Sequence, residues 1–87
     1  NLDAEVGQHM LYTTNDDVPG IIGLLGSLCG KHGVNIANFA LGRDRPGGDA
    51  IALLYLDAPF PEHVLTELLA DGRINSAKPL VFDVAAN

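Results

Sequence analysis

The spacing of hydrophobic residues changes several times along the chain, and each change predicts a new element of secondary structure. Residues 9–14 (HMLYTT) combine β-branched and aromatic side chains and end in a polar Asn-Asp-Asp triplet, which predicts a strand that runs into a loop. After Pro19-Gly20, leucine and isoleucine recur at spacings of three and four, as on the buried side of a helix. We expect this helix to be capped at its start by Asp17 and at its end by Gly33.

Two further strands are predicted in the middle of the chain. In residues 36–43 (IANFALGR) apolar residues alternate with small or polar ones, and the Gly- and Pro-rich residues 44–48 that come next predict a hairpin turn. Residues 49–57 (DAIALLYLD) are apolar almost throughout, as expected of a central strand whose two faces are both largely covered. We therefore expect this strand to pair back on the preceding one.

A second helix and a last strand complete the pattern. Residues 59–61 (PFP) open the helix, and residues 71–72 (DG) end it. Its apolar side consists of Val64, Leu65, Leu68 and Leu69. Residues 80–84 (LVFDV) have the composition of a strand. The order strand-helix-strand-strand-helix-strand predicts an α+β, ferredoxin-like βαββαβ fold, with a four-stranded antiparallel sheet and two helices on one face.

The length and composition indicate a single small domain that associates with other chains or domains. A chain of 87 residues builds one core, which we place at about residues 8–84, and the aperiodic ends suggest a domain excised from a longer chain. The residues are 47% hydrophobic and only 18% charged. Such an apolar small domain is expected to bury part of its surface against a partner.

Several classes of function are disfavoured by the residue content. The net charge is −6 and there are only five Lys and Arg residues, so we expect no nucleic-acid partner. No apolar run approaches the length of a membrane span, and the single Cys29 and the absence of zinc-type spacing fit a reducing, cytoplasmic setting. None of the histidines His9, His32 and His63 stands beside a nucleophile motif, so we expect no catalytic residue and no metal site.

The stretch NDDVPGIIGLLGSLCGKHGVNIANFALGR, followed by GGDAIALLYLD, resembles the ACT-domain family, whose signature is D-x-P-G, a helix, and then G-[VI]-N-I. The resemblance spans about residues 8–83. Within the family, GVNIANFALGR and the terminal PLVFDV are most similar to the C-terminal regulatory domains of D-3-phosphoglycerate dehydrogenases. The resemblance implies an allosteric module that binds L-serine and regulates the attached catalytic domains of an NAD-dependent enzyme, and that itself binds no cofactor.

The resemblance also implies which residues bind the amino acid. Serine-inhibited dehydrogenases carry His-x-Asn before x-P-G, where this chain has Asn15-Asp16-Asp17, and the Asn of G-V-N-I is Asn35. Backbone N–H groups at Gly20 and Ile21, at the positive end of a helix dipole, suit a carboxylate. The side-chain oxygens of Asn15 and Asp17 are acceptors for an ammonium group. Purely structural alternatives are a helix cap for Asp17 and an Asn turn for Asn35.

The last expectation concerns assembly. The strand at residues 36–43 lies at a sheet edge in this topology and is weakly charged, which proteins normally avoid on an unpaired edge. The resemblance implies a homodimer in which two such edges pair and each helix start faces Asn35 of the other copy. Two alternatives remain, a dimerisation domain without an effector and the ACT domain of an L-serine dehydratase. An acylphosphatase-like enzyme is disfavoured because the loop at residues 15–17 lacks arginine.

Overall fold

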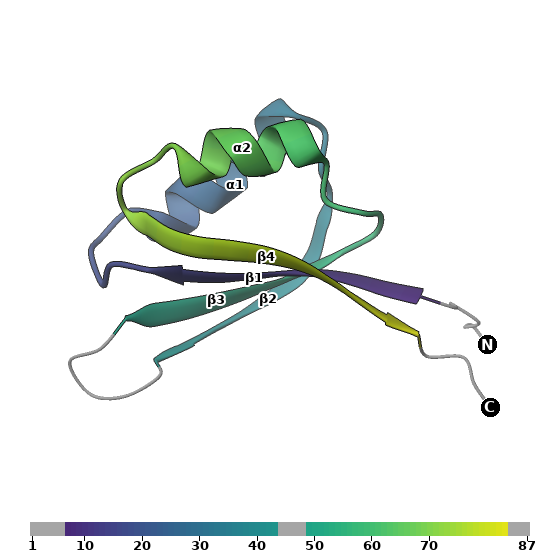
Figure 1. Ribbon diagram of the computed structural model, residues 1–87, viewed down its shortest axis with the longest axis horizontal. Helices are drawn as coiled ribbons and strands as arrows, with labels where there is room; N and C mark the ends of the chain where they lie inside the picture. Colours follow the sequence, from purple (N-terminus) through teal and green to yellow (C-terminus); the bar gives the residue numbers. More distant parts are fainter. Residues whose placement is uncertain (1–6, 44–48, 84–87) are drawn as a thin grey trace.

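A four-stranded antiparallel sheet carries two helices on one of its faces (Figure 1). The structure is a computed structural model that describes residues 7–43 and 49–83. The elements in chain order are β1 (Gly7–Asn15), α1 (Ile21–Lys31), β2 (Ile36–Arg43), β3 (Ala50–Leu56), α2 (Glu62–Leu69) and β4 (Ile74–Asp83). The strands lie in the order β2-β3-β1-β4, and every neighbouring pair is antiparallel. This confirms the predicted α+β, ferredoxin-like arrangement. The predicted turn at 44–48 lies outside the described residues.

The hydrophobic core lies between the sheet and the two helices. Leu11 of β1 and Leu54 of β3 are paired at the centre of the sheet and are fully enclosed. Leu25 of α1 and Val64 of α2 belong to the same buried cluster. Burying side chains of this kind contributes about 1.5–3 kcal/mol each. The buried cluster joins five of the six elements, and β2 contributes only the half-buried Ile36, which packs against it.

The two faces of β3 are covered to different degrees. Its helix-side residues Ala52 and Leu54 are buried, whereas Leu53 and Tyr55 on the opposite face are half-buried. No residue of β3 is exposed, which agrees with the prediction that both of its faces are largely covered. Both helices lie on the same side of the sheet, and the outer side chains of β3 are screened only by those of the neighbouring strands.

The last strand begins much earlier than the sequence predicted. β4 starts at Ile74 rather than Leu80, and it pairs with β1 along its whole length. The sequence prediction missed this part because polar residues and Pro79 interrupt the apolar pattern. The polar side chains fit the open face of the sheet, where the hydroxyl groups of Thr14 and Ser76 are hydrogen-bonded at 2.6 Å. Proline is tolerated at this position because β4 is an edge strand.

The sequence predicted the residue that ends α1 correctly, but not the residue that caps its start. Gly33 has a φ of 71°, as expected of a glycine just beyond the helix end. At the start, the N-cap residue is Gly20, with a φ of 93° and no side-chain hydrogen bond to the helix. Asp17 is therefore not the cap, and its carboxylate pairs with Arg43 instead. The chain turns into the helix through the left-handed conformation of Gly20, which leaves Asp17 outside the first turn.

The second helix packs through a narrower apolar stripe than predicted. Val64 and Leu68 of α2 are buried, but Leu69 is 45% exposed because it lies off the buried side of the helix. α2 is joined to the end of α1 by Glu67, which accepts hydrogen bonds from Lys31 Nζ and His32 Nε2, both at 2.8 Å. The two partners, Lys31 most strongly, lower the pKa of Glu67. Neither described helix is long and apolar enough to cross a membrane.

Exchanging glycine for alanine at the helix start and in the helix interior should have opposite effects on stability. Gly20→Ala is expected to destabilise the chain by about 1–2 kcal/mol, because a Cβ is disfavoured in the left-handed conformation. The matched Gly23→Ala should stabilise it by about 1 kcal/mol, because no atom lies within 4 Å of the added Cβ and alanine favours helix. Urea unfolding measures both, and equal stabilities would contradict the described helix start.

Candidate functional site

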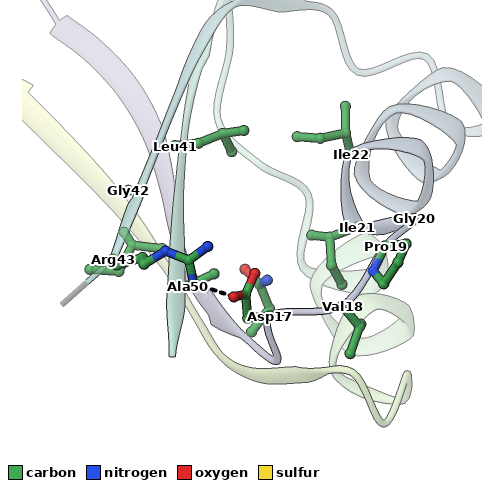
Figure 2. A pocket seen from close by; sticks show the side chains of 12 residues that line it. Asp17, Val18, Pro19, Gly20, Ile21, Ile22, Leu41, Gly42, Arg43 and Ala50 are labelled. Carbon is green, nitrogen blue, oxygen red and sulfur yellow. Dashed lines mark hydrogen bonds and ion pairs between the residues drawn. The ribbon is translucent and has the colours of Figure 1, made fainter. Parts of the chain in front are cut away.

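A cavity of about 410 Å³ lies between the start of α1 and the end of the edge strand β2. Figure 2 shows the loop before α1 on one side of this cavity and the last residues of β2 on the other. The lining residues are Asn15, Asp17, Val18, Pro19, Gly20, Ile21, Ile22, Leu41, Gly42, Arg43, Ala50 and Ile51. The cavity therefore joins segments that are far apart in the sequence, and it is large enough for a small metabolite.

Four of the five candidate residues line this cavity. Asn15, Asp17, Gly20 and Ile21 all contribute to its wall. Asn35 does not, since it lies beyond the other end of α1, where its amide group donates a hydrogen bond to the Asp57 carboxylate. A single copy of the chain thus brings together the residues at the helix start and leaves Asn35 apart from them.

The start of α1 offers backbone donors to the cavity. The first hydrogen bond of the helix runs from the Leu24 N–H to the Gly20 carbonyl at 2.9 Å. The N–H groups before Leu24 consequently have no acceptor within the helix, and no side chain among the described residues caps them. The first turn also contains no acidic residue. This end of the helix therefore presents unpaired donors and the positive end of the helix dipole to an anion.

Asn15 contributes an unpaired acceptor to the cavity wall. It is the last residue of β1 and is only 2% exposed. Its Nδ2 donates to the Asp16 carbonyl at 2.9 Å, but its Oδ1 has no hydrogen-bond partner among the described residues. A buried acceptor without a partner costs about 1–3 kcal/mol. A donor group on a ligand would remove this cost once the wall shifted enough to expose the oxygen.

The ion pair between Asp17 and Arg43 crosses the cavity from the loop to β2 (Figure 2). The two side chains are 53% and 52% exposed, respectively. Sequence reasoning missed Arg43 because it was counted only as the end of a strand. The signal was in the pairing of the strands, since Arg43 lies opposite Ala50, and Ala50 lies opposite Asn15. A charged residue that is aligned across the sheet with a predicted ligand-binding residue is itself a candidate for ligand binding.

The remaining wall of the cavity is apolar. Leu41 of β2 and Ile22 of α1 lie across from one another in Figure 2, and Val18 lies in the loop between β1 and α1. All three are partly exposed although they are large hydrophobic residues. The cavity thus combines a few polar groups with apolar walls, which is the usual composition of a small-molecule site.

The loop that carries Asp17 is held in place by the start of β4. The Asp16 N–H donates to the Arg73 carbonyl at 2.9 Å, and Asn75 Nδ2 donates to Asp16 Oδ1 at 3.1 Å. Arg73 is in turn fixed by Asp71, which accepts hydrogen bonds from its backbone N–H, Nε and Nη2 at 2.9–3.0 Å. These hydrogen bonds, with the Arg73 charge, lower the pKa of Asp71 to about 2.

Neither the metal-ligand residue types nor the single cysteine gives a second candidate site among the described residues. They contain no group of three or more His, Cys, Asp or Glu side chains that could hold a metal ion. Cys29 is buried, and burial raises the pKa of its thiol, which makes it a poor nucleophile. The cavity at the start of α1 is therefore the candidate site.

Comparison with known proteins relates this chain to one enzyme. No family model matches the chain. It is 46% identical over 69 residues to D-3-phosphoglycerate dehydrogenase of Synechocystis, and 39% identical over 71 residues to that of Archaeoglobus fulgidus. Identity to the Bacillus subtilis enzyme is 34% over 68 residues. These alignments cover 78–79% of this chain and 12–14% of the relatives. The chain is thus homologous to a short segment of these dehydrogenases.

The Asp71–Arg73 contact should make stability depend on acid pH. Because the folded chain holds the pKa of Asp71 at about 2, below its ordinary value of 3.8, the contact stabilises the fold above about pH 4. That contribution is lost as the pH falls towards 2. Asp71→Asn should lower the free energy of unfolding at pH 7 and flatten its decrease between pH 4 and pH 2. Urea unfolding across this range measures the effect, and parallel curves for the two proteins would contradict it.

Proposed function

We propose that this chain is an ACT-type regulatory module that binds L-serine and mediates feedback control of a D-3-phosphoglycerate dehydrogenase in serine biosynthesis. The observation that carries the proposal is the cavity at the start of α1, which contains four of the five residues expected to bind an amino acid. Homology to a segment of D-3-phosphoglycerate dehydrogenases supports the parent enzyme. We assign catalysis and NAD binding to other domains of that enzyme, and neither to these residues.

The chemistry of the cavity suits a free amino acid. A carboxylate would bind at the N–H groups of the first turn of α1, where the helix dipole favours negative charge. An ammonium group would donate to the carboxylate of Asp17 and to Oδ1 of Asn15, which lacks a partner among the described residues. Because donors and acceptors line the same small cavity, one ligand with both charges satisfies both sets.

We further propose that two copies pair through β2. This edge strand exposes Phe39 and Leu41, at 46% and 58%. The other edge strand, β4, carries Lys78 and Pro79, which are residues that block strand addition. Antiparallel pairing of two β2 strands would give a continuous eight-stranded sheet and would bring Asn35 of the other copy towards the start of α1. The effector site would then be shared between the copies.

A ligand-free dimerisation domain is the second candidate function. The Asp17–Arg43 ion pair favours it, because two charged groups of the cavity already satisfy each other within one chain. An L-serine dehydratase as the parent enzyme has less support, since the Synechocystis, Archaeoglobus and Bacillus relatives all carry the name of the dehydrogenase.

Binding of L-serine should raise the thermal stability of the chain. At a ligand concentration about 100 times the dissociation constant, binding adds about 2.7 kcal/mol to the free energy of unfolding. A thermal-shift titration with L-serine, with D-serine as the matched control, measures this effect. If neither L-serine nor any other amino acid in a millimolar screen raises the melting temperature, the ligand-free dimerisation domain is the better account.

Proline in β2 should dissociate the dimer. The Phe39 N–H donates to the side chain of Asn38 at 2.8 Å and is one of the donors along this edge. Phe39→Pro removes this donor and should give a monomer in sedimentation velocity, with weaker ligand binding. The matched control Val81→Pro alters the other edge strand and should leave the dimer intact. A Phe39→Pro variant that remains dimeric with full ligand affinity would rule out pairing through β2.

A further inference from the structure

We propose that Arg43 and Asp17 together select the charge state of the ligand, so that the cavity binds zwitterions and discriminates against simple carboxylates and simple amines. On binding, the ammonium group of the ligand would take the place of Arg43 at Asp17, and its carboxylate would take the place of Asp17 at Arg43. This inference rests on the proposed amino-acid-binding function. It adds to that function a specificity-determining residue, Arg43, and a ligand class.

The position of Arg43 makes it the cation available to a ligand. Among the described residues that line the cavity, Asp17 and Arg43 are the only charged ones. Of the other described cations, Arg73 is held by Asp71 and Lys31 by Glu67. Lys78 pairs with Tyr12 in the sheet register and does not line the cavity. An anion on the β2 side of the cavity therefore meets the Arg43 guanidinium group, whereas the backbone donors of α1 lie on the opposite side, where a Cβ added at Gly20 would lie 3.5 Å from Arg73 Nη1.

The ion pair is suited to an exchange of partners. Both side chains are about half exposed, and ion pairs in such positions contribute only about 0.2–1 kcal/mol. Breaking the pair therefore costs little. A bound ligand would itself cover part of both side chains beside Ile22 and Leu41, so water would be excluded on binding and its charge-assisted hydrogen bonds would become stronger than in open solvent.

The balance of charges explains the selection. The charges of Asp17 and Arg43, the charged residues in the described wall of the cavity, sum to zero, and so do those of a zwitterion, so after the exchange each of these charges again has a partner. A ligand with only a carboxylate would occupy Arg43 and leave Asp17 unpaired beside a second negative charge. A ligand with only an ammonium group would leave Arg43 unpaired beside a positive charge. The start of α1 adds to the preference for a carboxylate, and Oδ1 of Asn15 adds to the preference for an ammonium group.

The test crosses two variants of the 87-residue chain with two analogues of serine in titration calorimetry. L-Serinamide lacks the carboxylate, and N-acetyl-L-serine lacks the ammonium group. Measurements at about pH 6 keep the α-amino groups protonated. The wild type should bind L-serine about tenfold more tightly than either analogue, which corresponds to one charged contact. Arg43→Gln should lose the preference for L-serine over L-serinamide and keep the preference over N-acetyl-L-serine. Asp17→Asn should show the opposite pattern.

Conservative and remote variants serve as controls. Arg43→Lys keeps the positive charge and should retain the preference over the amide. Lys31→Gln and Glu62→Gln make the same changes in net charge outside the cavity and should leave both preferences unchanged. Thermal melting without ligand checks that each variant is folded. If Lys31→Gln changes the preferences as much as Arg43→Gln does, net charge alone is responsible and the proposal is wrong.

The outcomes separate this inference from the function on which it rests. If L-serine binds the wild type but Arg43→Gln binds it equally well or more tightly, with the preference over the amide unchanged, amino-acid binding stands and the role of Arg43 is refuted. If the wild type binds no amino acid, both proposals fall. If Arg43→Gln loses only the preference over L-serinamide and Asp17→Asn loses only the preference over N-acetyl-L-serine, both the proposed function and the role of the ion pair are supported.

Discussion

The structure depends above all on the pairing of β1 with two neighbours at once. β3 and β4 are antiparallel to β1 on its two sides, and the core residue Leu11 lies in the middle of this three-stranded unit. Backbone hydrogen bonds on both sides leave the strand no freedom to change register. The last residue of β1, Asn15, is held opposite Ala50 of β3 at the edge of the cavity, while its pairing with β4 shifts register between Thr14 and Asn15.

β1 ends at Asn15, and the geometry of the site beyond it depends on the loop that leads into α1. The loop from Asp16 to Gly20 has no regular structure, and it keeps its position through hydrogen bonds from Asp16 to the beginning of β4. Gly20 then turns the chain into α1 with a positive φ, so that the helix starts at the wall of the cavity. The positions of the donors thus result from one hydrogen-bonded loop and one glycine.

The sequence was sufficient to predict the order of the elements, and four of the five residues that it suggested for ligand binding line the cavity. Hydrophobic spacing correctly marked both helices and three of the strands, since burial on one face imposes the period. It missed the first half of β4, where the sheet is open to solvent and burial therefore imposes no apolar pattern. It also missed Arg43 and the wall residue Ile22, because their roles arise only when β2 lies beside the start of α1. Asp17 was named as a candidate and lies in the cavity wall, but its role as a helix cap is excluded by Gly20.

The difference between the two edges of the sheet sets a limit on growth. A protein with two open edges can add copies on both sides without end, which is the geometry of a fibre. In this chain, β4 carries Lys78 and Pro79 in its exposed edge, and β2 has no proline or lysine between Ile36 and Arg43. Two copies joined through β2 would present only the β4 edges outward. Assembly would then stop at two copies, because the β2 edge that favours association would be paired in the dimer and closed to a third copy.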